Sequence, residues 1–347
     1  MKKSLDQKLA AIHADPHGCK EFILADAKDA DMGFGVTAPG PQRDACPHGY
    51  DKTQGCHKTL TDYLKQIREV TAQGLVDIML LSASNLEKLA MQEGIFRDTA
   101  ITPAARANDT SDVWVVRGGK YIHLPSRPFR SASIDHIKYG RITDDHSAPV
   151  IGADLGLYSV TFTNNIDWDY RALEDFQEFR IEAEKKRFRY FLEVFNPNVD
   201  SGIPPAEIGA FLNDHIIRSL AGVTSAGRPV FLKIPYNGPG ALEELAAYDP
   251  HLIVGILGGG AGTAMDAFQQ IFDAKKYGAR VALYGRKINL SEDPLSFIEL
   301  LRRIAEGEIA PKEAVKAYHG VLQAKKIRPF RPLQADLQVT KTLKKYG

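Results

Sequence analysis

The sequence predicts an α/β protein with a (β/α)8 barrel fold. Eight apolar runs recur along the 347 residues, and helical patterns separate most of them. Most runs are continuously apolar, as expected of parallel strands that are covered on both faces. The length is sufficient for one large hydrophobic core. We therefore expect a single barrel domain over residues 1–347, with a doubly wound sheet as the alternative.

The predicted strands are short and rich in Val, Ile, Leu, Phe and Ala. They are residues 22–26 (FILAD), 76–83, 99–105, 155–162, 190–195, 229–236 (PVFLKIPY), 252–259 and 280–286. Helical patterns cover residues 60–74, 170–188, 206–223, 241–249, 263–279 and 296–322. The last three strand–helix units have the short spacing that a barrel uses.

Residues 106–150 interrupt this alternation. They contain VWVVRGGKYIHL, two short extended runs on either side of Gly118 and Gly119, which is the pattern of a β-hairpin. The segment follows the third predicted strand. We expect it to be an insertion that acts as a lid over the C-terminal mouth of the barrel.

Composition excludes several classes of protein. The formal net charge is +1 with acids and bases interspersed, so a nucleic-acid partner is not expected. No apolar stretch is long enough for a membrane span, and the charged N-terminus does not resemble a signal peptide. Three cysteines indicate a reducing environment, so we expect a cytoplasmic protein. We also expect a homo-oligomer.

Lys233 lies inside the apolar sixth strand, which is an unusual place for an ammonium group. Burial among apolar neighbours favours the neutral amine, and a neutral amine is a nucleophile that can attack a carbonyl carbon. The structural alternative is a lysine at a strand end whose amine reaches solvent.

Glu193 lies in the fifth apolar run, so it should be next to Lys233 in one cavity. A carboxylate there could keep the lysine charged or transfer protons during imine chemistry. A buried structural ion pair is the alternative. Asp26 ends the first predicted strand and Tyr236 ends the sixth, and both are candidate catalytic residues. Arg106 and Asn108 follow the third strand and are candidate substrate- or phosphate-binding residues, because barrel enzymes carry their chemistry at these strand ends.

A glycine-rich loop, LGGGAGTAMD, follows the seventh strand and precedes a helix. Its spacing fits neither the dinucleotide fingerprint nor a P-loop. Together with the segment after the eighth strand, it predicts the barrel phosphate site formed by the last two loops. The candidate phosphate-binding residues are Gly259, Gly260, Gly262, Gly285 and Arg286. A tight turn is the alternative explanation for the glycines.

No cofactor and no metal ion are predicted. Cys46, His48, Cys56 and His57 are close in sequence, but their spacing matches no common zinc site.

These motifs resemble the class I aldolases of the DeoC/LacD/FbaB superfamily, and the tagatose-bisphosphate aldolase branch most closely. The likeness rests on FLKIPY, FLEVF, LGGGAGT and GRKIN and covers roughly residues 150–320. It implies that Lys233 forms a Schiff base, that Glu193 assists proton transfer, and that Gly259, Gly260 and Arg286 hold a substrate phosphate. The first half of the chain departs from the family pattern.

The predicted function is that of a metal-independent carbon–carbon lyase. Lys233 would form an imine with a small phosphorylated ketose or keto acid, Glu193 or Tyr236 would move protons, and Asp26 would orient a hydroxyl group. The alternatives are an FMN-dependent barrel oxidoreductase, a thiolase-like or transaldolase-like relative, a non-catalytic sugar-phosphate-binding barrel, and a metal-dependent lyase using Asp26, Asp31 and Asp109.

Overall fold

The computed structural model describes residues 1–42, 57–260 and 262–340. Eight parallel strands form one sheet in the order β8-β7-β6-β3-β2-β1-β10-β9. The two outer strands of this order are joined by a parallel bridge between Ile234 and Ile256, which closes the sheet into a barrel. The predicted (β/α)8 fold is therefore confirmed, and the open sheet is excluded.

The barrel strands match the eight predicted runs in number and order. Most are shorter, since only the hydrogen-bonded centre of each run is regular. They are β1 (Ile23–Lys28), β2 (Ile78–Leu81), β3 (Thr102–Arg106), β6 (Leu155–Thr161), β7 (Arg189–Phe195), β8 (Leu232–Lys233), β9 (Gly255–Leu257) and β10 (Val281–Tyr284).

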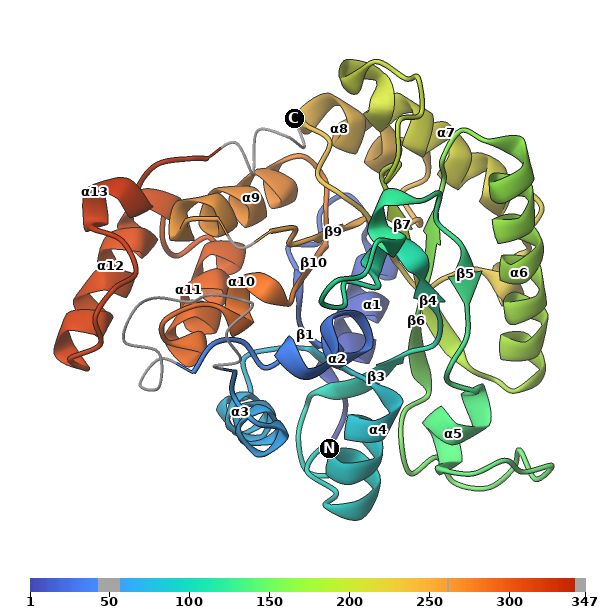
Figure 1. Cartoon of the computed structure of the whole chain (residues 1–347), viewed down its shortest axis with the longest axis horizontal. Helices are drawn as coiled ribbons and strands as arrows, with labels where there is room; N and C mark the ends of the chain where they lie inside the picture. Colours follow the sequence, from blue (N-terminus) through green and yellow to red (C-terminus); the bar gives the residue numbers. More distant parts are fainter. Residues whose placement is uncertain (43–56, 261, 341–347) are drawn as a thin grey trace.

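Helices surround the strands (Figure 1), with α6 and α7 on one side of the molecule and α9, α11 and α12 on the other. The larger ones are α1 (Ser4–Ala14), α3 (Leu60–Gln73), α6 (Ile166–Lys185), α7 (Ile208–Ala221), α8 (Pro239–Tyr248), α9 (Ala264–Lys276), α11 (Pro294–Glu306) and α12 (Pro311–Ala324). The shorter ones are α2 (Asp31–Phe34), α4 (Ala83–Leu86), α5 (Ile134–Tyr139), α10 (Arg286–Asn289) and α13 (Leu333–Asp336). Gly74 ends α3 in the left-handed conformation, as a glycine C-cap should.

Alternate residues of each strand point into the barrel, because side chains in a strand alternate between its two faces. The part of the barrel interior toward the N-terminal ends of the strands is apolar and includes Ile23, Ile78, Phe191 and Phe231. The opposite faces of the strands pack against the helices in a separate, larger cluster. This alternation decides which polar residues reach the interior at the C-terminal ends of the strands.

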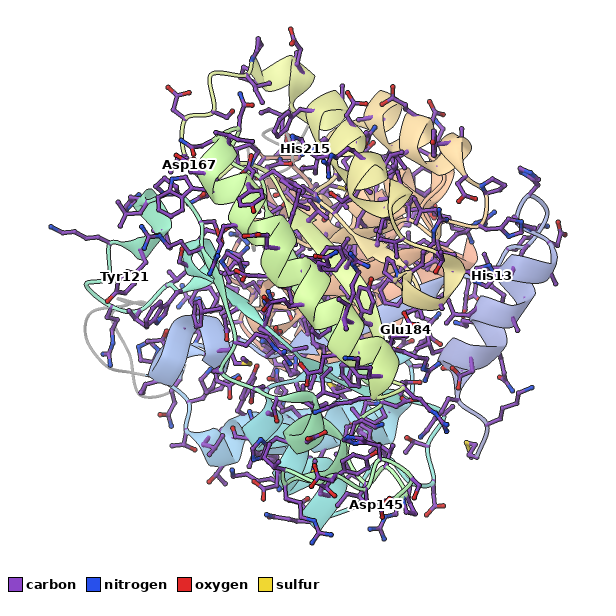
Figure 2. The ribbon with its side chains drawn as sticks, turned by 90° about the vertical axis from the view of Figure 1, so that its right-hand side faces the viewer. His13, Tyr121, Asp145, Asp167, Glu184 and His215 are labelled. Atoms are coloured by element: carbon purple, nitrogen blue, oxygen red, sulfur yellow. The ribbon has the colours of Figure 1, made fainter. Side chains whose placement is uncertain are left out.

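Helix α1 closes the N-terminal end of the barrel. Leu5, Leu9 and Ile12 are buried against the apolar interior residues. Figure 2 shows His13, on α1, and Tyr121, in the insertion, on opposite sides of the molecule, with α6 running between them. The end of the barrel opposite α1 is therefore the one that the insertion approaches.

Asp77 is the centre of a charged cluster at the closed end. Its carboxylate accepts hydrogen bonds from Arg302 at 2.7 Å, Lys8 at 3.0 Å and the backbone of Leu24 at 2.8 Å. Burial opposes ionisation of Asp77, but the two cations outweigh it, and the net effect is a lowered pKa. The cluster joins α1, the loop before β2 and α11.

The insertion contacts loops that follow strands on opposite sides of the barrel. Its backbone binds the loop after β1 through Val115 N–H and Gly33 O at 2.8 Å. On the opposite side, Asn198 donates to the carbonyl groups of Ile122 and Leu124, at 3.2 and 2.6 Å.

The paired strands of the insertion differ from those expected. They are β4 (Asp109–Thr110) and β5 (Pro128–Phe129), which are antiparallel. The runs beside Gly118 and Gly119 form turns and the short 3-10 helices Ser111–Val113 and Tyr121–His123. Trp114 stacks on Tyr121, with ring centroids 4.4 Å apart, so aromatic packing takes the place of strand pairing.

Within the described residues, no helix has the combination of length and apolar character that a membrane crossing requires.

Candidate active site

Lys233 and Glu193 form a buried ion pair across two adjacent strands. They are register partners on β8 and β7, and Lys233 Nζ lies 2.6 Å from Glu193 Oε1. Their side chains are 8% and 2% exposed, so water screens the pair little. Both point into the barrel, in phase with Phe231 and Phe191. The sequence prediction that they are neighbours is therefore what the structure shows.

Ser159 continues this row of side chains onto the next strand. It is the register partner of Glu193 on β6, and its hydroxyl donates to Glu193 Oε2 at 2.7 Å. The Ser159 backbone exchanges two hydrogen bonds with the Asn108 side chain, at 2.6 and 2.9 Å. Asn108 thus holds this strand in place rather than lining the cavity.

Arg106 links the row to the loop after β1. Its guanidinium group donates to Ser159 Oγ at 3.1 Å and lies 3.5 Å from Glu193 Oε2. On its other side it binds Asp29 Oδ2 at 2.6 Å. Burial opposes the charge of Arg106, but Asp29 and Glu193 outweigh it and raise the pKa of the guanidinium. Charges therefore alternate along Asp29, Arg106, Glu193 and Lys233.

A cavity of about 220 Å³ lies at the C-terminal end of the barrel, and the four alternating charges line it. Lys233 and Glu193 are in its wall, together with residues from the insertion and from the last two loops. Its polar or glycine lining residues are Asp29, Gly33, Arg106, Asp109, Asp112, Glu193, Lys233, Gly258, Gly259, Gly285 and Arg286.

The last two loops form one wall of the cavity. Gly259, Gly285 and Arg286 line it, as the sequence predicted, and Gly258 lies beside them. Gly259 has φ of 63°, and a Cβ atom at Gly258 would lie 2.2 Å from the Tyr284 ring. The backbone conformation and packing therefore explain these two glycines without a ligand.

Gly260 and Gly262 do not line this cavity. Gly262 borders a separate small hollow near the start of α9. The first turn of α9 already has carboxylate partners: Asp266 accepts from Thr263 N–H, and Asp336 accepts from Ala264 N–H, both at 2.9 Å. The N-terminus of α9 is thus capped from within the chain.

The insertion forms the wall opposite the glycine loops. Asp109 accepts a hydrogen bond from Ser131 at 2.9 Å, and burial raises the pKa of its carboxyl group. Asp112 accepts from Ser126 at 2.7 Å and from Thr161, at the end of β6, at 2.8 Å. Both carboxylates border the cavity.

Asp26 lies outside the cavity. It is out of phase with the inward-facing Ala25 and Ala27 of β1, so its side chain points toward the helices. There it pairs with Lys28 at 2.8 Å, and Lys28 also donates to Asn289 of α10. Burial raises the pKa of Asp26 and lowers that of Lys28, although each charge opposes the shift of the other. The role of orienting a substrate hydroxyl is therefore not retained for Asp26.

Tyr236 also points away from the cavity. It belongs to the outer apolar cluster, and burial raises the pKa of its hydroxyl group. It follows β8 by three residues and is out of phase with Lys233. Proton transfer is therefore not assigned to Tyr236.

The three acids of the metal-dependent alternative have separate partners. Asp31 accepts hydrogen bonds from Ser82 and Asn85, at 2.6 and 3.0 Å, whereas Asp26 binds Lys28. Among the described residues, no group of three or more His, Cys, Asp or Glu side chains could hold a metal ion. Of the cysteine–histidine motif, Cys46, His48 and Cys56 lie outside the described residues.

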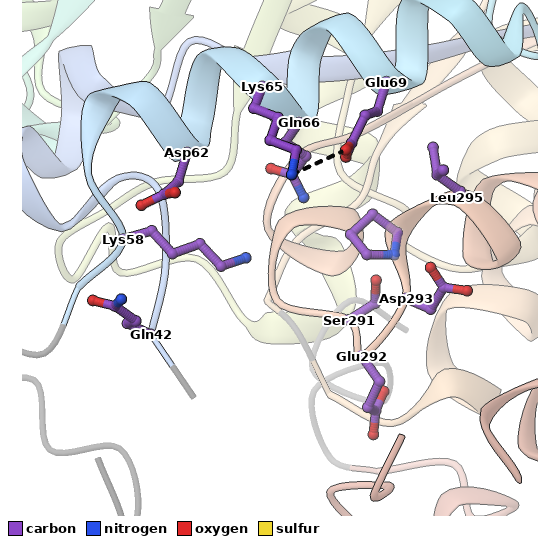
Figure 3. Close-up of a pocket in the computed structure, with 11 residues that line it drawn as sticks. Gln42, Lys58, Asp62, Lys65, Gln66, Glu69, Ser291, Glu292, Asp293 and Leu295 are labelled. Carbon is purple, nitrogen blue, oxygen red and sulfur yellow. Dashed lines mark ion pairs between the residues drawn. The ribbon is translucent and has the colours of Figure 1, made fainter. Parts of the chain in front are cut away.

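A second, larger hollow lies outside the barrel, between α3 and residues 291–295 (Figure 3). Its walls carry mixed charges, including the exposed Lys65–Glu69 pair at 3.9 Å. Neither Lys233 nor Glu193 is in its wall.

Sequence reasoning did not identify Ser159 and Asp112 as site residues. Ser159 interrupts an apolar strand in the same way as Glu193 and Lys233 do, and this was the available signal. Asp112 follows Asp109 by three residues in a segment without a regular pattern, so no signal marked it.

Comparisons with known proteins agree with the fold. No protein-family model matches the chain, and no curated protein matches it. Among solved structures, a fructose-bisphosphate aldolase from Slackia heliotrinireducens DSM 20476 has a TM-score of 0.63 at 12% identity, covering 91% of each chain. An archaeal fructose 1,6-bisphosphate aldolase has a TM-score of 0.59 at 14% identity, covering 86% of this chain and 99% of that chain. A structure described as a Schiff base forming fructose-1,6-bisphosphate aldolase gives 0.59 at 13% identity, with the same coverage. The chain therefore has the barrel fold of these aldolases.

Proposed function

We propose that this protein is a class I aldolase-like lyase that forms a Schiff base between Lys233 and a small phosphorylated ketose or keto acid. The observation that carries the proposal is the buried contact between Lys233 Nζ and Glu193 Oε1 in the wall of the cavity at the C-terminal end of the barrel. The sequence likeness to the tagatose-bisphosphate aldolase branch and the structural likeness to fructose-bisphosphate aldolases support a ketose phosphate as substrate.

Imine formation needs a neutral amine on Lys233. Glu193 is the carboxylate in contact with Nζ, so it takes the ammonium proton as substrate binds. The amine then attacks the carbonyl carbon, and the carbonyl oxygen accepts a proton to give a carbinolamine. Loss of water leaves a protonated imine, whose positive charge the same carboxylate stabilises.

The protonated imine accepts the electron pair of the bond that breaks. Removal of a proton from the substrate hydroxyl group releases an aldehyde and leaves an enamine on Lys233. Protonation of the enamine carbon and hydrolysis of the imine release the second product and regenerate the amine. We assign the proton transfers to Glu193, which Ser159 and Arg106 hold in place.

The substrate phosphate binds at the wall formed by the last two loops. Backbone N–H groups near Gly259 and the guanidinium group of Arg286 provide donors for an anion there. We further propose that the chain works as one barrel domain, in which residues 106–150 form a lid that keeps water from the imine.

Borohydride trapping tests the mechanism. Reduction in the presence of a ketose phosphate should add the mass of the reduced substrate to the peptide containing Lys233. Lys233→Met keeps an apolar stem of similar length and should give no adduct and no turnover, while Lys185→Met, on the exposed face of α6, should behave as wild type. Substantial turnover by Lys233→Met would exclude the mechanism.

A further inference from the structure

The two ends of the cavity are on opposite sides of the barrel. In the closed strand order, β3 is four strands from β9 counted in either direction. Asp109 and Asp112 follow β3, whereas Gly259 follows β9 and Arg286 follows the adjacent strand, β10. Lys233, on β8, lies between these two walls. A substrate that reacts at Lys233 therefore has one end toward each wall.

The cationic side chains that line the cavity differ in whether a carboxylate of the protein already pairs with them. Arg106 is bound by Asp29 at 2.6 Å, and Lys233 is bound by Glu193 at the same distance. Arg286 forms no ion pair with any described residue. The positive charge that a substrate anion can use is therefore on the β10 side of the cavity.

The opposite wall carries two carboxylates. Neither Asp109 nor Asp112 forms an ion pair within the described part of the chain, although the charge of Arg106 acts on Asp109 and offsets in part the rise that burial causes in its pKa. Hydroxyl groups of Ser131, Ser126 and Thr161 donate hydrogen bonds to them. A carboxylate has about four lone-pair positions. After accepting from Ser131, Ser126 and Thr161, both retain acceptor capacity that suits a donor such as a sugar hydroxyl group.

A phosphate at this wall would meet like charge in a poorly hydrated place, where repulsion is strong. The cavity volume, about 220 Å³, is also below the range of roughly 300–1,000 Å³ common for drug-sized ligands. Charge and size both favour a small substrate that is anionic at one end.

We propose that the substrate is a polyhydroxy ketose with a single phosphate, held at the Arg286 wall, and that Asp109 and Asp112 bind its hydroxyl end and exclude a second phosphate. This inference rests on the proposed aldolase function and makes it more specific. It separates this chain from the bisphosphate aldolases whose fold it shares.

The test compares fructose 1-phosphate, fructose 6-phosphate and fructose 1,6-bisphosphate in the borohydride reaction and in a cleavage assay. We expect one monophosphate to label Lys233 and to exceed the bisphosphate in kcat/KM by about tenfold or more. The double variant Asp109→Asn, Asp112→Asn should reduce this preference, because it removes both charges and keeps the shape. The matched control, Asp144→Asn and Asp167→Asn at exposed positions, should retain it.

The outcomes separate the two proposals. Labelling of Lys233 with a preference for the bisphosphate would overturn the single-phosphate inference and leave the aldolase mechanism standing. Absence of any adduct, with all three sugars, would overturn both. If the double asparagine variant does not fold, the wild-type preference still decides the inference.

Discussion

Lys233 and Glu193 are register partners on β8 and β7, and their charged groups are 2.6 Å apart. The strand ladder fixes this distance, because register partners on adjacent parallel strands place their side chains side by side. Glu193 is further held by Ser159 and Arg106. A carboxylate held in this way needs little rearrangement to act in the proton transfers that we propose for it.

Glu193→Gln should reduce turnover strongly while the protein stays folded. Glutamine keeps the shape of glutamate and can still accept a hydrogen bond from Ser159, but it cannot take a proton from Lys233. We expect kcat to fall by about 10²–10⁴, which is typical for loss of a general acid–base. Steady-state kinetics measure the fall, and thermal unfolding monitors the fold.

Ser159→Ala is the matched comparison. It removes one hydrogen bond to Glu193 and leaves its charge, so the loss should be about tenfold or less. Equal losses in the two variants would mean that Glu193 acts through its position alone.

The sequence predicted Lys233 and Glu193 because a single charge in an apolar strand is conspicuous, whichever face it occupies. It did not predict which polar residues face inward. In a strand buried on both faces, the positions that face inward and those that face the helices are both apolar. The sequence pattern therefore does not show which face a polar residue occupies. Asp26 is a candidate on sequence grounds because it ends the first predicted strand, but the inward-facing residues of β1 are Ala25 and Ala27.

The insertion was predicted less well than the barrel. Its position after the third strand was correct, but its paired strands, β4 and β5, lie on either side of the expected hairpin, and Trp114 and Tyr121 stack where that hairpin was expected. Contacts such as that between Asn198 and Leu124 join residues far apart in sequence, and no local pattern reveals them.

Arg286→Ala should raise KM for a phosphorylated substrate and affect an unphosphorylated analogue much less. Arg286 lines the cavity together with Gly259 and Gly285, and its guanidinium group could form a charge-assisted hydrogen bond to a phosphate bound there. Parallel kinetics with a sugar phosphate and the free sugar measure the difference. Equal changes for both substrates would assign Arg286 a structural role.

Asn198→Ala should loosen the insertion over the cavity. The side-chain amide of Asn198 donates to two insertion carbonyl groups, and both hydrogen bonds would be lost. We expect faster tryptic cleavage near Arg117 and Lys120, together with a lower kcat. Asn196→Ala is the control, since Asn196 binds Asn237 instead. Unchanged cleavage would show that these bonds do not hold the insertion.

Asp77→Asn should destabilise the closed end of the barrel by about 3 kcal/mol, because it leaves Arg302 and Lys8 without their carboxylate. The lowered pKa of Asp77 sets the pH dependence. The pKa of Asp77 is lower in the folded protein than in the unfolded chain, where it has the ordinary value of about 3.9. The stability that ionised Asp77 contributes is therefore fully present above that value and is lost as the pH falls through the pKa of the folded protein.

Urea unfolding from about pH 7 to pH 3 measures this effect. The difference in the free energy of unfolding between wild type and Asp77→Asn should be constant near neutral pH and should become smaller below about pH 4. Glu93→Gln breaks the exposed Arg68–Glu93 pair and should cost about 1 kcal/mol or less. If the difference in the free energy of unfolding stays constant down to about pH 3, the ionised form of Asp77 contributes nothing to stability.

Asp26→Asn should lower stability and leave the chemistry largely intact. The Asp26–Lys28 pair is fully buried, and asparagine at position 26 would leave the Lys28 charge without its carboxylate partner. Removing one partner of a buried pair costs about 3–5 kcal/mol, whereas replacing both by apolar residues of similar size is often neutral. The double variant Asp26→Leu, Lys28→Met should therefore recover most of the stability lost in Asp26→Asn.

Urea unfolding of wild type and the two variants gives their free energies of unfolding, and kcat measured at urea concentrations below their unfolding transitions reports the chemistry. A large fall in kcat in Asp26→Asn, with stability unchanged, would return Asp26 to the active site against the outward direction of its side chain.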